Sequence, residues 1–390
     1  MAKTKKAHSR SSRALDRASK ETLMFMQGNA AIANAAKAAG ATHFFGYPIT
    51  PSTEVFETWV KLTGDPASPA ISPVTKKALQ YLQCEDEMAS GFAMIGACMA
   101  GAKAFTATAG PGNILMQDAF AMAEALRIPT VAIIMQRGGL STSTVIYSQE
   151  EVTLTTLGGN GEGFRIVYSP TGMQELYDYT IKAFNMAWKY RYPTFVLGDG
   201  YQGKMQGEVQ LHPMKKSDYI SPEPILLGKK RKEHISTNLR NCYDLEEEIA
   251  PIIESYKADF ARDSKLIAES ESYKTKDAHT LIVAHGIVAG AAKVAVNMLR
   301  EHGASVGLWR PITLRPLDIN SLSKAAGKAK EIIYVESALG QLSRLVRDAL
   351  MEHYGKGKEG NPRIPHSREL FRPALGITPQ EIIDFVLSKK

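Results

Sequence analysis

Three consecutive acidic residues, Glu85, Asp86 and Glu87, stand at the start of a segment whose Ala- and Gly-rich pattern predicts a helix over residues 87–101. Neighbouring carboxylates raise one another's pKa, and a carboxyl group with a raised pKa suits general acid–base chemistry. We therefore take Glu87 as the candidate catalytic acid. The alternative is an acidic helix start that the helix dipole favours.

Thr50 and Arg137 could bind a carboxylate together. A guanidinium group donates two parallel hydrogen bonds to a carboxylate, and a threonine hydroxyl adds a third. Gly110 and Gly112 would let the backbone approach a flat ring closely, because they have no side chain. Simpler roles stay open for each residue: a turn or cap for Thr50, an ion pair for Arg137, and a strand-to-helix turn without a ligand for the two glycines.

Thr50, Gly110, Gly112 and Arg137 each follow a segment that predicts a buried strand. Strands are expected at residues 42–47, 104–108, 129–135 and 194–198, with helices between them. Strands that alternate with helices predict an α/β fold with a parallel sheet covered on both faces. Ligands of such sheets bind beyond the carboxyl ends of the strands. We therefore expect Thr50, Gly110, Gly112 and Arg137 to lie at one edge of the sheet.

The pattern divides the chain into four regions. Residues 1–22 are expected to be a basic flexible arm, and residues 23–200 the first α/β domain. Residues 201–275, which contain a loop-like stretch with Pro213, Pro222 and Pro224 and a long charged helix near 244–271, are expected to link it to a second, smaller α/β domain at 276–390. In that domain His285-Gly286 predicts a strand-to-helix turn and not a catalytic histidine.

Composition excludes several classes of protein. The 390 residues are 44% hydrophobic and 22% charged, as in an ordinary folded protein. Residues 1–20 carry seven basic side chains against Asp16, so nearly all of the net charge of +7 belongs to the arm, and no nucleic-acid binding is expected from it. No apolar run approaches the roughly 20 residues of a membrane span. The three cysteines form no CxxC pair, which argues against a thiolate-bound metal or cluster in this chain and favours the cytoplasm.

Five motifs in order and spacing resemble the α subunit of the 2-oxoacid:ferredoxin (2-oxoacid:acceptor) oxidoreductases, over residues from about Met24 to at least Arg347. The motifs are Gly46-Tyr47-Pro48-Ile49-Thr50-Pro51-Ser52-Thr53-Glu54, Glu85-Asp86-Glu87, Thr106-Ala107-Thr108-Ala109-Gly110-Pro111-Gly112, Gln136-Arg137-Gly138-Gly139 and Arg310-Pro311-Ile312-Thr313-Leu314. The resemblance implies a parallel-sheet domain that binds the pyrimidine of thiamine diphosphate, followed by a transketolase C-terminal-like domain.

The resemblance also implies roles for the candidate residues. Glu87 would hydrogen-bond the N1′ nitrogen of the aminopyrimidine. Glu87 is preferred to Glu85 for this role because its spacing to Gly96 is the one that this family shows. Thr50 and Arg137 would bind the 2-oxoacid, and the cofactor would contact Glu87, Pro48, Ile49, Gly110 and Gly112. No metal is expected in this chain, because Gly198-Asp199-Gly200 begins like a magnesium–diphosphate motif but no Asn follows between residues 200 and 238.

The same resemblance implies partners. A β subunit would supply Mg²⁺, the diphosphate site and an iron–sulfur cluster, [4Fe-4S] clusters being expected only in partner chains. Separate γ- and δ-type subunits, coenzyme A and ferredoxin or another electron acceptor would complete the anaerobic reaction. Two alternatives remain, another thiamine-diphosphate enzyme of the transketolase or dehydrogenase type and a non-catalytic scaffold subunit.

Two departures bear on the site. The family pattern Gly-Asn-Glu-Ala is here Gly28-Asn29-Ala30-Ala31, so an acidic group is missing near the expected subunit contact. The loop from Leu140 to Tyr147 is more apolar than expected for a dicarboxylate site, and the further cations near the motifs, Arg127 and Lys103, are expected at helix ends facing solvent. The sequence therefore favours an apolar or aromatic 2-oxoacid slightly over 2-oxoglutarate, while a cation from the β subunit would reverse that preference.

Overall fold

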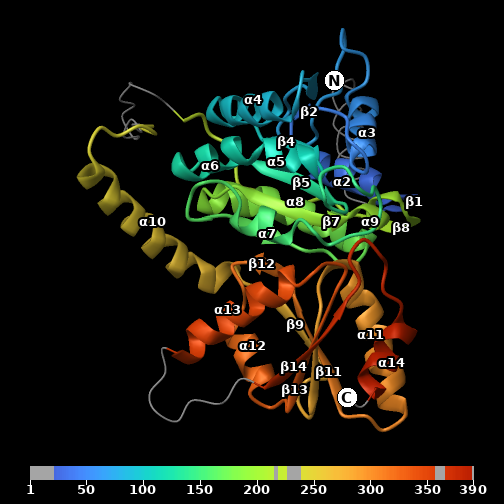
Figure 1. The fold of residues 1–390 in the computed structure, drawn as a ribbon. Helices are drawn as coiled ribbons and strands as arrows, with labels where there is room; N and C mark the ends of the chain where they lie inside the picture. Colours follow the sequence, from blue (N-terminus) through green and yellow to red (C-terminus); the bar gives the residue numbers. More distant parts are fainter. Residues whose placement is uncertain (1–21, 215–217, 226–238, 356–364, 389–390) are drawn as a thin grey trace, which may run out of the picture.

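A computed structural model describes residues 22–214, 218–225, 239–355 and 365–388. The arm expected over residues 1–22 lies outside the described residues apart from Thr22, which begins the first strand. The chain forms two α/β domains, one above the other in Figure 1, each built on a mainly parallel sheet. The α/β class predicted from the alternation of strands and helices is therefore confirmed.

The first domain contains a seven-stranded sheet whose neighbouring strands are parallel, except that edge strand β12 runs antiparallel to β6. Across the sheet the strands are β12 (Thr313–Arg315), β6 (Ile166–Tyr168), β7 (Thr194–Asp199), β5 (Val131–Gln136), β4 (Ala104–Thr108), β2 (His43–Gly46) and β3 (Gln80–Gln83). Every residue of β4, β5 and β7 is buried, as expected for the centre of a parallel sheet covered on both faces.

Helices cover both faces of this sheet through two apolar layers. The first layer contains α2 (Gly28–Ala38), α3 (Thr53–Thr63) and α8 (Met173–Tyr190). The second contains α4 (Glu87–Met99), α6 (Gln117–Ala125) and α7 (Val152–Leu157), with the short α5 (Pro111–Leu115) beside them. Because α4 and α5 each begin close to the carboxyl end of a strand, their first residues meet at one edge of the sheet.

The second domain contains a five-stranded sheet in which only β9 is antiparallel to its neighbour. Its strands are, in order, β14 (His366–Phe371), β13 (Glu331–Glu336), β10 (Thr280–Val283), β11 (Val306–Pro311) and β9 (Ser270–Tyr273). Two helices lie on each face, α11 (Gly286–Glu301) with α14 (Pro379–Leu387), and α12 (Ile319–Ala326) with α13 (Gln341–Gly355). His285 occupies the N-cap position of α11, two residues after the end of β10, so the predicted strand-to-helix turn is confirmed.

Both ends of the stretch expected as a linker, residues 201–275, take part in regular structure. At its start, α9 (Gly200–Lys204) leads into β8 (Gln206–Leu211), which pairs antiparallel with β1 (Thr22–Gln27). At its end, β9 joins the second sheet. Between them, the long helix α10 (Glu246–Ile267) runs alongside the first domain towards the second (Figure 1). No helix in the described parts of the chain is long and apolar enough to cross a membrane.

Candidate functional site

The candidate residues meet where β2, β4 and β5 end. Parallel pairing brings the turn after β2, which contains Thr50, next to Gly110 after β4 and Arg137 after β5. Arg137 donates a hydrogen bond from Nη1 to the backbone oxygen of Thr50 at 2.7 Å. The structure thus brings Thr50, Gly110, Gly112 and Arg137 together with Glu87 at one sheet edge.

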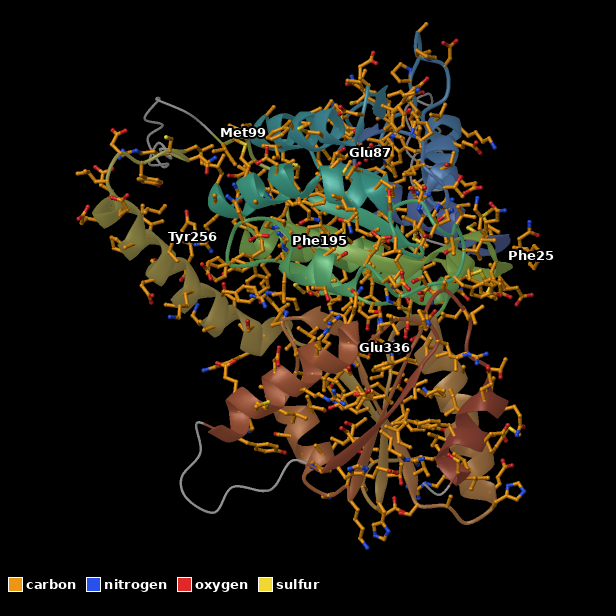
Figure 2. All side chains as sticks on the ribbon, in the orientation of Figure 1. Phe25, Glu87, Met99, Phe195, Tyr256 and Glu336 are labelled. Carbon is orange, nitrogen blue, oxygen red and sulfur yellow. The ribbon has the colours of Figure 1, made fainter. Side chains whose placement is uncertain are left out.

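Glu87 is the first residue of α4 and is only 5% exposed, whereas its neighbour Glu85 is exposed. The helix begins here because the side chain of Asp86 accepts a hydrogen bond from the backbone nitrogen of Ala89 at 2.7 Å. Burial raises the pKa of Glu87, and the negative charge of Asp86 adds to that effect, while Arg137 and the backbone N–H of Glu87 itself oppose it. Glu87 is therefore the member of the acidic cluster whose environment suits a proton donor. Figure 2 labels Glu87 in the first domain.

The two glycines make room for side chains of this same chain. A Cβ atom on Gly112 would lie 2.6 Å from Oε1 of Glu87, and one on Gly110 would lie 2.6 Å from Nε of Arg137. Gly110 also has a φ of 51°, a conformation that favours glycine. The absence of these two side chains is what allows Glu87 and Arg137 to lie against the turn between β4 and α5.

Thr50 meets Arg137 through its backbone, not through the hydroxyl group that the sequence suggested. The Thr50 residue is exposed, Pro48 beside it is exposed as well, and Ile49 is half-buried. Arg137 is 5% exposed, and its Nε is buried without a hydrogen-bond partner among the described residues. The guanidinium group thus uses one nitrogen on the turn and retains donors for another ligand.

Asn29 stabilises the turn that contains Thr50. Its Nδ2 donates to the backbone oxygen of Pro51 at 2.7 Å and to Oε2 of Glu54 at 2.8 Å. Glu54 in turn forms an ion pair with Lys204. Asn29 of the Gly28-Asn29-Ala30-Ala31 motif therefore has a structural role, and half-buried Ala30 stands where the family pattern has an acid.

Sequence reasoning missed Glu151, a residue 4% exposed at the start of α7. Its Oε1 accepts hydrogen bonds from the backbone nitrogens of Gly110 at 2.8 Å and Arg137 at 3.0 Å. Its Oε2 accepts one from Nδ2 of Asn113 at 2.8 Å. The only signal in the sequence was the polar run Gln149-Glu150-Glu151 after the apolar loop, and nothing in it indicates contacts with residues up to 41 positions away.

The edge between the two domains holds a second polar cluster. Asp199 at the end of β7 accepts hydrogen bonds from Gln136 Nε2 at 3.2 Å and from the backbone nitrogen of Ile287 at 2.9 Å. Burial raises its pKa to about 7. Buried His285 contacts Ser169 through Nδ1, and burial lowers its pKa to about 3, so it is neutral at physiological pH. Within the described residues, no three His, Cys, Asp or Glu side chains gather as a metal site would require.

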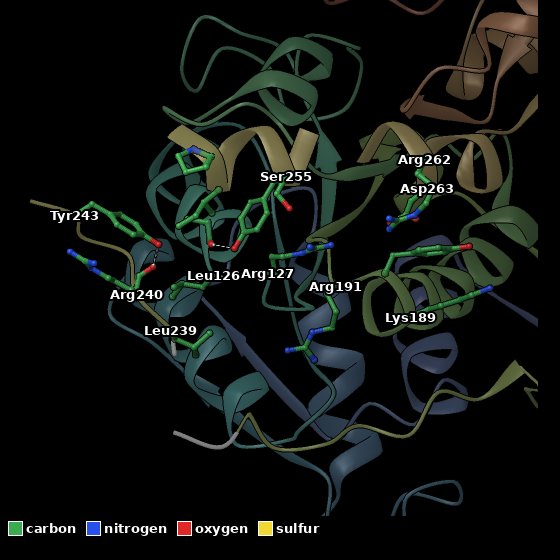
Figure 3. A pocket seen from close by; sticks show the side chains of 15 residues that line it. Leu126, Arg127, Lys189, Arg191, Leu239, Arg240, Tyr243, Ser255, Arg262 and Asp263 are labelled. Carbon is green, nitrogen blue, oxygen red and sulfur yellow. Dashed lines mark hydrogen bonds and ion pairs between the residues drawn. The ribbon is translucent and has the colours of Figure 1, made fainter. Parts of the chain in front are cut away.

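The two further cations considered for the substrate lie away from this edge. Arg127 precedes β5 and pairs with Asp259 on α10 at 2.7 Å, beside a cavity of about 930 Å³ that Figure 3 shows. Lys103 precedes β4 and was expected to face solvent, but it is fully buried, donates to the backbone oxygen of Ala39 and lies over the ring of Tyr219. Both therefore stand at the amino ends of strands, whereas the candidate site lies at the carboxyl ends.

The site fits the pyrimidine ring of thiamine diphosphate. Thr108 Oγ1 and Arg137 Nε are buried without partners among the described residues; Thr108 ends β4 close to Gly112, and Arg137 follows β5 and lies against Gly110. Buried polar groups usually have partners, so unsatisfied groups gathered at one edge are consistent with a ligand there. Glu87, with its raised pKa, offers the carboxyl group that the ring nitrogen N1′ requires.

Comparisons with known proteins agree with the motifs. The family model described as pyruvate flavodoxin/ferredoxin oxidoreductase, thiamine-diphosphate-binding, matches residues 34–262, and the model for pyruvate:ferredoxin oxidoreductase core domain II matches 278–360. The chain is 36% identical to the 2-oxoglutarate synthase subunit KorA of Methanocaldococcus jannaschii, over 82% of this chain and 89% of that one. It is 30% identical to the ketoisovalerate oxidoreductase subunit VorB of Methanothermobacter marburgensis, over 83% and 89%.

A solved structure shares the fold. The 2-oxoglutarate:ferredoxin oxidoreductase of Magnetococcus marinus, solved with 2-oxoglutarate, coenzyme A and succinyl-CoA bound, aligns with a TM-score of 0.77 and 24% identity. The alignment covers 93% of this chain and 64% of that chain. Together with the family models, this match confirms the resemblance drawn from the five motifs and the predicted pair of domains in that order.

Proposed function

The chain belongs to the pyruvate flavodoxin/ferredoxin oxidoreductase family and is a subunit of a thiamine-diphosphate-dependent 2-oxoacid oxidoreductase, and from this we propose that its first domain supplies the pyrimidine side of the active site. When bound, thiamine diphosphate supplies the electron sink that lets a 2-oxoacid lose carbon dioxide. The observation that carries the proposal is buried Glu87 beside Gly112, with its raised pKa.

Glu87 would hold a proton at N1′ of the aminopyrimidine and exchange it during each catalytic cycle. Its raised pKa favours the protonated form relative to an ordinary glutamate, and positioned acids of this kind contribute roughly 10²–10⁴-fold to rate. Pro48, Ile49, Gly110 and Gly112 would form the surface that the ring lies against. In the single chain Pro48 is exposed and Ile49 is half-buried, so both side chains are accessible to a ligand.

Arg137 would bind the carboxylate of the 2-oxoacid. One of its nitrogens holds the turn through the Thr50 oxygen, and its remaining donors can form charge-assisted hydrogen bonds to a carboxylate. Thr50, exposed at the same turn, would add its hydroxyl group. Desolvated carboxylates require such pairing, because an unpaired buried charge is strongly unfavourable.

A partner chain would complete the site. Around the candidate residues the chain exposes a band of large apolar side chains: Tyr47, Leu82, Met88, Ile114, Leu115 and Leu140. An exposed apolar surface of this kind marks a protein contact. We propose that a β-type subunit covers it and supplies Mg²⁺, the diphosphate site and an iron–sulfur cluster, that γ- and δ-type subunits, coenzyme A and ferredoxin take part in the reaction, and that the complex is cytoplasmic.

The substrate is the least constrained part of the proposal, because the relatives include both 2-oxoglutarate and ketoisovalerate enzymes by name. A dicarboxylate needs a second cation, and Arg127 and Lys103 lie at the opposite edge of the sheet. The loop after Arg137 instead exposes Leu140, Val145, Ile146 and Tyr147. These observations favour an apolar or aromatic 2-oxoacid over 2-oxoglutarate.

The test is to co-express the chain with its partner chains and to assay 2-oxoglutarate, pyruvate, 2-oxoisovalerate and an arylglyoxylate with coenzyme A. Thiamine-diphosphate-dependent reduction of ferredoxin by the complex, and none by the chain alone, is the expected result. A tenfold or greater preference for 2-oxoglutarate, about 1.4 kcal/mol, would refute the substrate proposal. A purified active complex without iron–sulfur clusters would instead indicate a transketolase- or dehydrogenase-type enzyme.

A further inference from the structure

One buried carboxylate joins two turns of the candidate site. Glu151 Oε1 receives the backbone N–H groups of Gly110 and Arg137, and Oε2 receives the side-chain amide of Asn113. Gly110 ends the turn after β4, and Arg137 begins the turn after β5. One oxygen atom therefore fixes the distance between the turn after β4 and the turn after β5. The sheet by itself fixes only the positions of the strands that precede these turns.

The side chains that lie between these turns are the ones proposed for catalysis. Arg137 lies against Gly110, and Glu87 lies against Gly112, two residues further along at the start of α5. Arg137 then reaches the Thr50 oxygen of a third turn. A displacement of the Gly110 backbone relative to Arg137 would therefore move the substrate-binding guanidinium group relative to Glu87.

The three groups that donate hydrogen bonds to Glu151 require a carboxylate at this position. An amide oxygen could replace Oε1, but the amide nitrogen of a glutamine would then face Nδ2 of Asn113, donor against donor. The side-chain amide of Asn113 cannot rotate to present its oxygen instead without losing a hydrogen bond, because Oδ1 of Asn113 accepts from Nε2 of Gln117 at 2.9 Å. Burial raises the pKa of Glu151, and its three hydrogen bonds together with Arg137 offset that rise only in part.

We propose that Glu151 is a positioning residue, which sets the distance between Arg137 and the Gly110–Gly112 turn without touching the substrate. The inference rests on the proposed function, since the residues it positions are those assigned to the 2-oxoacid and to the cofactor. Small displacements of binding groups have large effects on rate, of the order of 10²-fold for about 1 Å.

The experiment compares variants of the complete complex in a double-mutant cycle. Glu151→Gln and Asn113→Asp should each reduce kcat/KM at least tenfold, mainly through a higher KM for the 2-oxoacid. The double variant restores donor to acceptor between positions 151 and 113, because the new amide donates to the new carboxylate, which still accepts from Gln117. The Thr155 hydroxyl, which now accepts from Asn113 Nδ2 at 3.1 Å, can donate to that carboxylate instead. The double variant should recover kcat/KM to within threefold of the wild type, a strongly non-additive result.

Asp263→Asn is the matched control. Asp263 is also a buried acid, which accepts a hydrogen bond from the Tyr192 hydroxyl at 3.0 Å, but it lies on α10. Its variant should lower the melting temperature and leave KM unchanged. Unchanged KM and kcat in Glu151→Gln, or a double variant as impaired as the single ones, would overturn the proposal. If Glu151→Gln does not assemble, the double variant alone decides.

Hydrogen exchange separates this inference from the proposed function. The amides of Gly110 and Arg137 should exchange faster in Glu151→Gln and at the wild-type rate in the double variant, whether or not the complex oxidises 2-oxoacids. A wild-type complex without that activity would refute the function and leave the exchange result standing. Equal exchange in wild type and Glu151→Gln would refute the positioning role.

Discussion

The carboxyl group of Glu87 lies against the α-carbon of Gly112, so closely that a Cβ atom on Gly112 would stand 2.6 Å from Oε1. The two residues come from different elements, the start of α4 and the start of α5, and they meet because both helices begin at the same edge of the sheet. The orientation of the buried acid is therefore set by a residue that has no side chain.

Gly112→Ala should lower kcat by about 10²-fold, because the added methyl group would overlap Oγ1 of Thr108 and lie 2.6 Å from Oε1 of Glu87, so these side chains or the backbone of the turn must shift. Steady-state kinetics of the complex check this. Gly96→Ala is the control within α4, since a Cβ atom there meets nothing within 4 Å. That variant should keep full activity and gain up to about 1 kcal/mol of stability from its helix propensity. Full activity in Gly112→Ala would show that Glu87 does not require its present position.

Glu87→Gln should lower kcat by roughly 10²–10⁴-fold while the complex still assembles, since glutamine keeps the shape of the side chain but has no proton to exchange. Glu85→Gln is the control, because Glu85 is exposed two residues earlier. Turnover numbers and gel filtration of both variants provide the measurement. If Glu85→Gln were inactive and Glu87→Gln active, the acid would have been assigned to the wrong residue.

Much of the fold could be predicted because its signals are local. The predicted helix at 87–101 and the strands at 104–108 and 194–198 agree to within two residues with α4, β4 and β7, where periodicity and flanking turns mark the ends. The strands β12, β1 and β8 escaped prediction. β12 has three residues, follows β11 of the second domain in the sequence and pairs with β6 of the first domain. A pairing between segments so far apart leaves no local pattern in the sequence.

The candidate site shows the same limit. Glu87, Thr50 and Arg137 could be selected by residue type and motif, and the structure brings them together. The geometry between them could not be predicted, because it depends on which atoms meet. Arg137 binds the carbonyl of Thr50 and not its hydroxyl, and Glu151 is bonded to Gly110 from 41 residues away. Hydrogen bonds between distant loops have no periodicity that a sequence would reveal.

The raised pKa of Asp199 predicts how the stability of the folded chain depends on pH. Its pKa is about 7 in the folded chain against an ordinary value of 3.8, because the carboxyl group is buried. Between these values the folded form keeps a proton that the unfolded form releases. The stability from this group is therefore complete below pH 3.8 and is lost as the pH rises through about 7.

Asp199→Asn should remove that dependence. The variant amide can still accept from the Ile287 N–H group, and its nitrogen can donate to Gln136 Oε1, which has no partner among the described residues. Thermal unfolding of the complex should show a flatter pH profile for the variant, with a gain in stability over the wild type at about pH 8. Parallel profiles for the two proteins would contradict the raised pKa.

Arg137→Lys tests the substrate-binding role. Arg137 gives one nitrogen to the Thr50 oxygen and has further donors for a carboxylate, whereas lysine has one compact ammonium group that cannot hold both in the same geometry. Losing charge-assisted hydrogen bonds worth about 1.5–3 kcal/mol should raise KM for the 2-oxoacid roughly 10- to 100-fold. Arg127→Lys, at the opposite edge of the sheet, is the control and should leave KM unchanged. Because Glu87 keeps its place when Arg137 is shortened, kcat should fall less than KM rises. An unchanged KM in Arg137→Lys would mean that another cation, from a partner chain, binds the carboxylate.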